Sequence, residues 1–129
     1  MSAIPEHPIY VVDDDVPVLL SLCFLLQGEG HRVESFSDGH SVLAAFPGPE
    51  PRFLVLDYVM PDIDGIELFR ELRARDVRAP AVLMTGDPGQ AVRQRARIAG
   101  LAVIEKPLAY EPLLAMLAEV DSAPRHSAI

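Results

Sequence analysis

Five short apolar runs recur along the chain, and longer mixed segments separate them. The runs cover residues 8–13, 31–36, 53–57, 81–85 and 101–104. Four of them are almost continuously apolar, which is typical of strands that are buried on both faces of a parallel sheet. The run at 31–36 instead carries Val33 and Phe36 among polar residues. The pattern therefore predicts five strands, with the second at an exposed edge of the sheet.

The segments between these runs predict helices, because their apolar residues recur at helical spacing. Pro17 suits the first turn of a helix that ends near Gln27. We expect Asp38 to cap a short second helix. Asp64 followed by Glu67 resembles a capping box, which predicts the start of a third helix.

The last two helices are marked in the same way. Asp87-Pro88 predicts the start of the fourth helix and Gly100 its end, while Glu111-Pro112 predicts the start of the fifth. Strands that alternate with helices in this manner need helical crossovers between parallel neighbours. The sequence therefore predicts an α/β fold, a doubly wound five-stranded parallel sheet with five helices.

The chain has 129 residues, enough for one such domain with a single core. We expect this domain to span residues 8–121. An N-terminal extension would then cover 1–7, and a flexible C-terminal tail would cover 122–129.

Charge and composition narrow the possible functions. The net charge of -8 disfavours binding to nucleic acids or anionic membranes, since both need a basic face. The N-terminus lacks a signal-peptide pattern, and no apolar stretch is long enough to span a bilayer. The single cysteine, Cys23, provides no disulfide framework and fits a reducing compartment. We therefore expect a cytoplasmic protein.

The candidate chemistry lies at the carboxyl ends of the strands, where ligands bind in doubly wound sheets. Those ends carry three carboxylates, a hydroxyl and an ammonium, on Asp13, Asp14, Asp57, Thr85 and Lys106. Lys106 is the single lysine of a chain that otherwise uses arginine. Asp15, the third aspartate of the run VVDDD, is expected to begin the following helix instead.

This set of residues suits phosphoryl transfer assisted by a divalent cation. Clustered carboxylates raise one another's pKa unless a cation binds between them. A group of oxygen ligands with room for water suits Mg²⁺. A carboxylate beside that cation and a lysine is well placed to attack a phosphoryl group, because both positive charges neutralise the transferring oxygens.

Four motifs extend this interpretation. The segments VVDD, LVLDYVMPDIDG, LMTGD and VIEKPL, in this order, resemble the receiver domain of two-component response regulators, the CheY-like proteins. The resemblance covers about residues 8–120. It implies the strand order 2-1-3-4-5 for the sheet. It also implies a phosphoacceptor that assists its own phosphorylation and dephosphorylation, rather than an enzyme that acts on a separate substrate.

The resemblance assigns roles to individual residues. It implies that Asp57 is the phosphoacceptor, and that the phosphoryl group comes from a sensor histidine kinase or a phosphotransfer protein. Thr85 and Lys106 would bind that group. The implied ligands of Mg²⁺ (or Mn²⁺) are Asp13, Asp14, Asp57 and the backbone carbonyl of Val59.

Further expectations follow from the same resemblance. The peptide before Pro107 would be cis, and the fourth helix, fifth strand and fifth helix would form a signalling face for a downstream protein. We expect no direct binding to DNA or a membrane, and a monomer or weak homodimer. Many receivers precede an output domain, whereas few residues follow the last predicted helix here. A stand-alone receiver is therefore favoured over a piece of a longer regulator.

Two positions depart from the family's usual pattern. Val103 stands where members commonly carry an aromatic residue that moves with the threonine. The usual switch therefore lacks its aromatic side chain. Val59 is expected to hinder attack by water on a phosphoryl group, which suggests slow loss of that group.

Two alternative functions are weighed beside the receiver. A haloacid dehalogenase-like phosphatase would use Asp13 as its nucleophile, because DDD after an apolar strand fits the D-x-D motif. A receiver-like adaptor would keep the fold without being phosphorylated.

The remaining charged residues are expected to be ordinary surface residues. Arg93, Arg95 and Arg97 would lie on a solvated helix face, since alternate residues do not share one side of a helix. The histidines show no metal-binding spacing and are expected at the surface; they are His7, His31, His40 and His126.

Overall fold

A computed structural model of the chain describes residues 7–86, 89–106 and 110–122. Its strands form one sheet with the order β2-β1-β3-β4-β5, and every neighbouring pair is parallel. The strands are β1 (Ile9–Val12), β2 (Val33–Phe36), β3 (Phe53–Asp57), β4 (Ala81–Thr85) and β5 (Ala102–Glu105). The predicted strands, the exposed edge at β2 and the order implied by the resemblance are confirmed.

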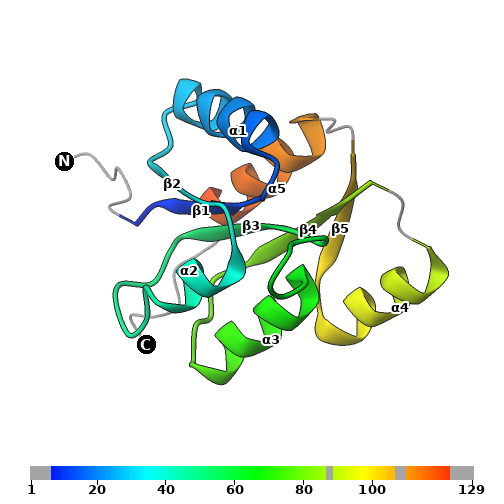
Figure 1. The fold of residues 1–129 in the computed structure, drawn as a ribbon. Coiled ribbons are helices and arrows are strands. Elements are labelled where there is room, and N and C mark those ends of the chain that lie inside the picture. Colours follow the sequence, from blue (N-terminus) through cyan, green and yellow to red (C-terminus); the bar gives the residue numbers. More distant parts are fainter. Residues whose placement is uncertain (1–6, 87–88, 107–109, 123–129) are drawn as a thin grey trace.

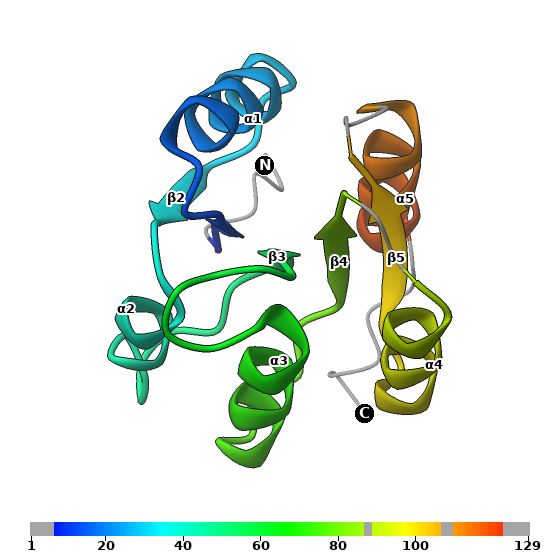
Figure 2. The same ribbon diagram turned by 45° about the vertical axis from the view of Figure 1, so that its right-hand side comes forward.

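Helices cover both faces of this sheet. They are α1 (Val16–Gly28), α2 (Gly39–Leu43), α3 (Gly65–Ala74), α4 (Gln90–Ala99) and α5 (Tyr110–Ser122). Figure 1 shows α1 and α5 on one face and α2, α3 and α4 on the other, and Figure 2 shows the same layers after rotation. The predicted doubly wound α/β fold is confirmed. In the described part of the chain, no helix combines the length and apolar character that a bilayer-spanning segment needs.

The core has two halves because successive side chains of a strand point to opposite faces of the sheet. The buried residues that point toward α2, α3 and α4 include Tyr10, Val12, Leu54, Leu56 and Leu83. Toward α1 and α5 point Ile9, Val11, Phe53, Val55, Val82 and Met84. The central strands are thus apolar on both faces, and the first polar position after such a strand lies at the edge of the sheet.

Three predicted N-caps are confirmed. Asp15 accepts a hydrogen bond from the Val18 N–H at 3.3 Å at the start of α1. At the start of α2, Asp38 accepts from the Ser41 N–H over 2.7 Å. At the start of α3, Asp64 accepts from the Glu67 N–H over 2.8 Å. Each carboxylate satisfies an N–H of the first turn that has no partner within the helix.

The predicted start of α4 is not tested by the structure, whereas α5 begins close to its predicted start. α4 begins at Gln90 with Gly89 as its N-cap, and the predicted start at Asp87-Pro88 lies outside the described residues. Gly100 ends α4 in a left-handed conformation, as predicted. α5 begins at Tyr110, one residue before the predicted pair Glu111-Pro112.

The turn between β3 and α3 depends on Gly65. Its N–H donates to the Tyr58 carbonyl over 2.9 Å. A Cβ at this position would lie 2.4 Å from the carbonyl oxygen of Asp57 and 2.7 Å from Leu83 Cδ1. Both distances are far shorter than a carbon contact allows, so α3 begins this close to the end of β3 only because residue 65 has no side chain.

We therefore expect Gly65→Ala to destabilise the protein by about 1–3 kcal/mol, because the added methyl group must displace backbone. Gly28→Ala is the matched control, since a Cβ at Gly28 meets nothing within 4 Å. The control should be neutral or slightly stabilising, as Ala has the higher helix propensity. Urea unfolding of both variants measures the difference, and equal stability of the two would contradict this account of the turn.

Candidate functional site

Three carboxylates meet at the carboxyl edge of the sheet. Asp13 and Asp14 follow β1, and Asp57 is the last residue of β3, its neighbour in the sheet. One oxygen of each lies within 4.8 Å of the others. Asp13 and Asp57 are buried, with 0% and 4% exposure, whereas Asp14 is exposed. The group is thus closed toward the protein and open to solvent on the side of Asp14.

Lys106 joins the two buried carboxylates. Its Nζ lies 2.8 Å from Asp57 Oδ1 and 3.1 Å from Asp13 Oδ2. It follows β5, and its backbone N–H donates to the Thr85 carbonyl at the end of β4 over 2.8 Å. Thr85 is itself buried. The structure therefore brings the five residues singled out by their position after strands to one edge of the sheet.

Asp15 does not belong to this group. Its side chain caps α1, and its backbone N–H donates to Asp13 Oδ1 over 2.9 Å. The expectation that it begins the helix is confirmed. The hydrogen bond also orients Asp13, whose two oxygens face the Asp15 N–H and the Lys106 ammonium.

Burial and charge change the titration of the site. Burial raises the pKa of Asp57 to about 6, with a further contribution from the nearby charge of Asp13, although Lys106 acts in the opposite direction. Burial lowers the pKa of Lys106, but its contacts with Asp57 and Asp13 outweigh this and raise the pKa above its ordinary value. The ammonium therefore stays charged near neutral pH.

The donor set fits a hard divalent cation. When all three carboxylates are ionised, three negative charges face the single positive charge of Lys106. The donors are all carboxylate oxygens. Because Asp14 is exposed, there is space for water molecules on a bound metal. Such a site suits Mg²⁺, which prefers oxygen ligands and keeps several waters.

One arginine lies elsewhere than predicted. Arg95 does not sit on a solvated face, because its guanidinium donates to the Tyr58 hydroxyl over 3.1 Å and lies 3.5 Å from Asp64. The prediction was wrong for this residue. Helical spacing carried the relevant signal, since Arg95 lies three residues after Val92 and four before Ala99, and both pack against the core.

Other expectations have mixed outcomes. His7 and His40 are exposed, whereas His31 is half-buried against Arg52. His126 and the peptide before Pro107 lie outside the described residues. Val103 is half-buried in β5 and packs against the core cluster beneath α3 and α4.

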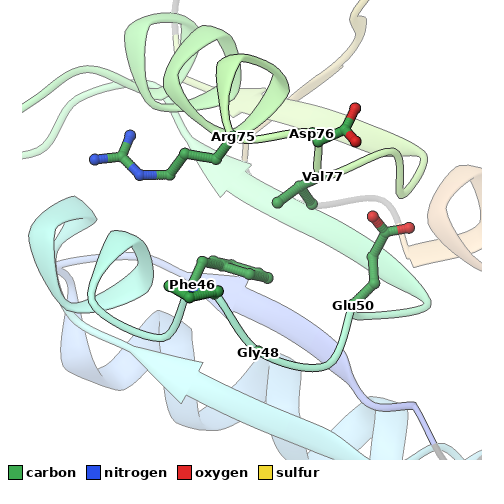
Figure 3. A pocket seen from close by; sticks show the side chains of 7 residues that line it. Phe46, Gly48, Glu50, Arg75, Asp76 and Val77 are labelled. Atoms are coloured by element: carbon green, nitrogen blue, oxygen red, sulfur yellow. The ribbon is translucent and has the colours of Figure 1, made fainter.

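A separate hollow of about 390 Å³ lies at the opposite edge of the sheet. Phe46, Glu50 and Val77 line it together with Arg75 and Asp76, as Figure 3 shows. Its charged side chains already have partners in the protein: Arg75 pairs with Glu71, Asp76 pairs with Arg78, and Glu50 accepts from the Arg78 N–H. The hollow lacks the concentrated charge of the carboxylate cluster, so the cluster is the candidate site.

Comparisons with known proteins agree with the fold and show the family to which the chain belongs. A family model described as the response regulator receiver domain matches residues 9–118. The transcriptional regulatory protein FixJ of Bradyrhizobium diazoefficiens is 36% identical over 110 residues, which cover 84% of this chain and 54% of that protein. FixJ of Rhizobium meliloti is 33% identical over 130 residues, which cover 92% of this chain and 64% of that protein. The chain thus spans between half and two thirds of these relatives.

Two solved structures resemble this chain closely in fold. The crystal structure of FixJ-N has a TM-score of 0.82 at 28% identity and covers 94% of this chain and 98% of that one. A CheY-like receiver domain protein from Methanospirillum hungatei has a TM-score of 0.80 at 28% identity and covers 89% of this chain and 94% of that one.

The raised pKa of Asp57 has a consequence for stability when divalent metal is removed by EDTA. The folded protein binds a proton at Asp57 up to about pH 6, whereas an unfolded chain releases it near pH 4. The free energy of unfolding therefore decreases as the pH rises from about 4 to about 6. Asp57→Asn removes the ionisable group, so we expect it to be more stable than wild type by about 1–3 kcal/mol above pH 6, and nearly equal below pH 4.

Thermal unfolding of both proteins between pH 4 and pH 8, in EDTA, measures this difference. Asp38→Asn is the control, since Asn caps a helix as well as Asp and the position lies outside the cluster. A variant Asp57→Asn that is less stable than wild type at pH 7.5 would contradict the electrostatic account.

Proposed function

The chain belongs to the receiver domain family of two-component response regulators, and on this basis we propose that Asp57 accepts a phosphoryl group from a histidine kinase or a phosphotransfer protein. The observation that carries the proposal is the placement of Asp57, buried beside Asp13 and bonded to Lys106 over 2.8 Å. A carboxylate held in this way can be ionised near neutral pH, and its negative charge is partly neutralised by the ammonium.

In the transfer step an oxygen of the Asp57 carboxylate forms a bond to phosphorus. The phosphorus–nitrogen bond of the donor phosphohistidine breaks, and its electron pair returns to the imidazole. Lys106 neutralises charge on the transferring oxygens. Thr85, buried at the end of the adjacent strand β4, supplies a hydroxyl that donates to the same group.

The proposed ligands of Mg²⁺ are Asp13, Asp14, Asp57 and the backbone carbonyl of Val59. When bound, the cation supplies positive charge that offsets the repulsion among the carboxylates and the phosphoryl oxygens. The clustering of three carboxylates within 4.8 Å supports this assignment.

Phosphorylation would change the domain by shifting its population between two conformations. The added charge at Asp57 is bound by Lys106 and Thr85 better in one conformation than in the other. Thr85 ends β4 and Lys106 directly follows β5, and these strands precede α4 and α5 in the chain. We therefore propose that a downstream protein reads the face formed by α4, β5 and α5.

The phosphatase alternative receives less support from the geometry. Its nucleophile would be Asp13, which has 0% exposure and whose oxygens face the Asp15 N–H and the Lys106 ammonium. Asp57 would have no role in that mechanism. The match to the receiver family over residues 9–118 also favours the receiver.

We expect beryllofluoride, which stands in for the phosphoryl group, to bind in the presence of Mg²⁺. Asp57→Ala should abolish this binding, because the proposed acceptor oxygen is lost, whereas Asp38→Asn should leave it unchanged. NMR titration with and without Mg²⁺ measures both. If Asp13→Ala abolishes binding and Asp57→Ala does not, the phosphatase is favoured; an absence of binding to wild type favours the adaptor.

We also expect slow loss of the phosphoryl group, with a lifetime of minutes or longer. The Val59 side chain is 67% exposed two residues after Asp57 and presents an apolar surface to approaching water. Val59→Asn should speed the loss several-fold, because an amide can hydrogen-bond a water molecule. Phosphorylation by acetyl phosphate, followed by mass spectrometry over time, measures the rate. Loss from the wild-type protein within seconds contradicts this expectation.

A further inference from the structure

Tyr58 connects three elements around the proposed phosphoacceptor. It directly follows Asp57 in the chain. Its backbone N–H donates to the Met84 carbonyl in β4 over 2.8 Å, and its carbonyl accepts from the Gly65 N–H at the start of α3 over 2.9 Å. Its hydroxyl accepts from the Arg95 guanidinium in α4 over 3.1 Å. The residue next to Asp57 is therefore hydrogen-bonded to β4, α3 and α4 at once.

Arg95 is held on the side of α3 as well. Its Nη2 lies 3.5 Å from Asp64 Oδ2 and 3.6 Å from Glu67 Oε2. Asp64 is the N-cap of α3, so its position is set by the start of that helix. These carboxylates orient the guanidinium toward the Tyr58 hydroxyl.

Apolar packing holds α4 only weakly. Ala96 is the one buried residue of α4, whereas α3 has five buried residues over the same length. The N-cap Gly89 provides no side-chain hydrogen bond to the first turn. Polar contacts therefore matter more for α4: one comes from Arg95, and another from Arg93, which pairs with Glu105 in β5. A helix with so little buried apolar surface shifts position at low cost.

We infer that the hydrogen bond between Tyr58 and Arg95 couples the state of Asp57 to the position of α4. The inference rests on the proposed function. Tyr58 lies between Asp57, the proposed site of phosphorylation, and Val59, whose carbonyl is a proposed metal ligand. Binding at both of its neighbours changes the backbone geometry at Tyr58, and α4 follows through Arg95. Tyr58 is thus a positioning residue, and it acts in a domain that has Val103 in place of the aromatic switch residue.

The coupling requires that the hydrogen bond differ in strength between the two forms of Asp57. Because the donor is charged and the contact is partly buried, its loss changes an equilibrium between two positions of α4 on the order of tenfold. Coupling is reciprocal, so loss of the bond changes the affinity for a ligand at Asp57 by a corresponding factor.

A double-mutant cycle on the full chain tests this inference. Tyr58→Phe removes the hydroxyl and keeps the ring, and Arg95→Met removes the guanidinium and keeps an unbranched side chain. Two quantities are measured: the affinity for beryllofluoride with Mg²⁺, and the change in amide hydrogen exchange across 90–99 on binding. We expect either single variant to reduce the change in hydrogen exchange across 90–99 on the order of tenfold. The double variant should reduce it no further than the more severe single variant does.

Arg93→Met is the matched control, because it removes a polar contact of α4 that does not involve Tyr58. Its effect on α4 should add to that of Tyr58→Phe. If Tyr58→Phe binds beryllofluoride and α4 responds as in wild type, or if the cycle is additive, the inference is overturned and the proposed function stands. If wild type fails to bind beryllofluoride at Asp57, the proposed function is overturned, and the inference with it.

Discussion

The ion pairs of Lys106 with Asp13 and Asp57 are the contacts on which the candidate site depends. Two carboxylates about 4 Å apart repel by roughly 4 kcal/mol at an effective dielectric constant of 20. Burial makes ionisation still less favourable, which is why the pKa of Asp57 rises to about 6. A single ammonium offsets only part of the charge of three carboxylates. The site is therefore held together and remains electrostatically unsatisfied, a condition that favours binding of a cation.

Sheet geometry explains why this charge gathers at one edge. All strands are parallel, so the residues that end or directly follow β1, β3, β4 and β5 lie at the same edge of the sheet. The central strands are apolar on both faces, and polar side chains appear only where the strands end. The opposite edge contains charged residues too, but Arg75, Asp76 and Glu50 already have partners there. The carboxyl edge differs because its three carboxylates face only one ammonium, that of Lys106.

The two sides of the site differ in how firmly they are held. Gly65 places α3 directly against the end of β3, and the five buried residues of α3 anchor it in the core. α4 has one buried residue, with Val92 and Ala99 packed against the core, and its arginines add polar contacts with Tyr58 and Glu105. Asp57 therefore lies between a helix with much buried apolar surface, α3, and one with little, α4. The proposed coupling between Asp57 and α4 rests on this asymmetry.

Local sequence determines most of the secondary structure and the polar groups at the strand ends. The apolar runs, the caps Asp15, Asp38 and Asp64, and the polar residues that follow the strands were predicted, because alternation, capping and strand ends depend on neighbours in the chain. The contact of Arg95 with Tyr58 was not predicted, since those residues lie on separate elements and meet only when α3 and α4 pack side by side. The pKa of Asp57 also depends on burial and on Asp13 and Lys106, which lie far from it in the chain. Local sequence therefore specifies which elements form and which groups end the strands. Which charges meet, and how much of each helix is buried, follows only from the packed fold, because both depend on distances between residues remote in sequence.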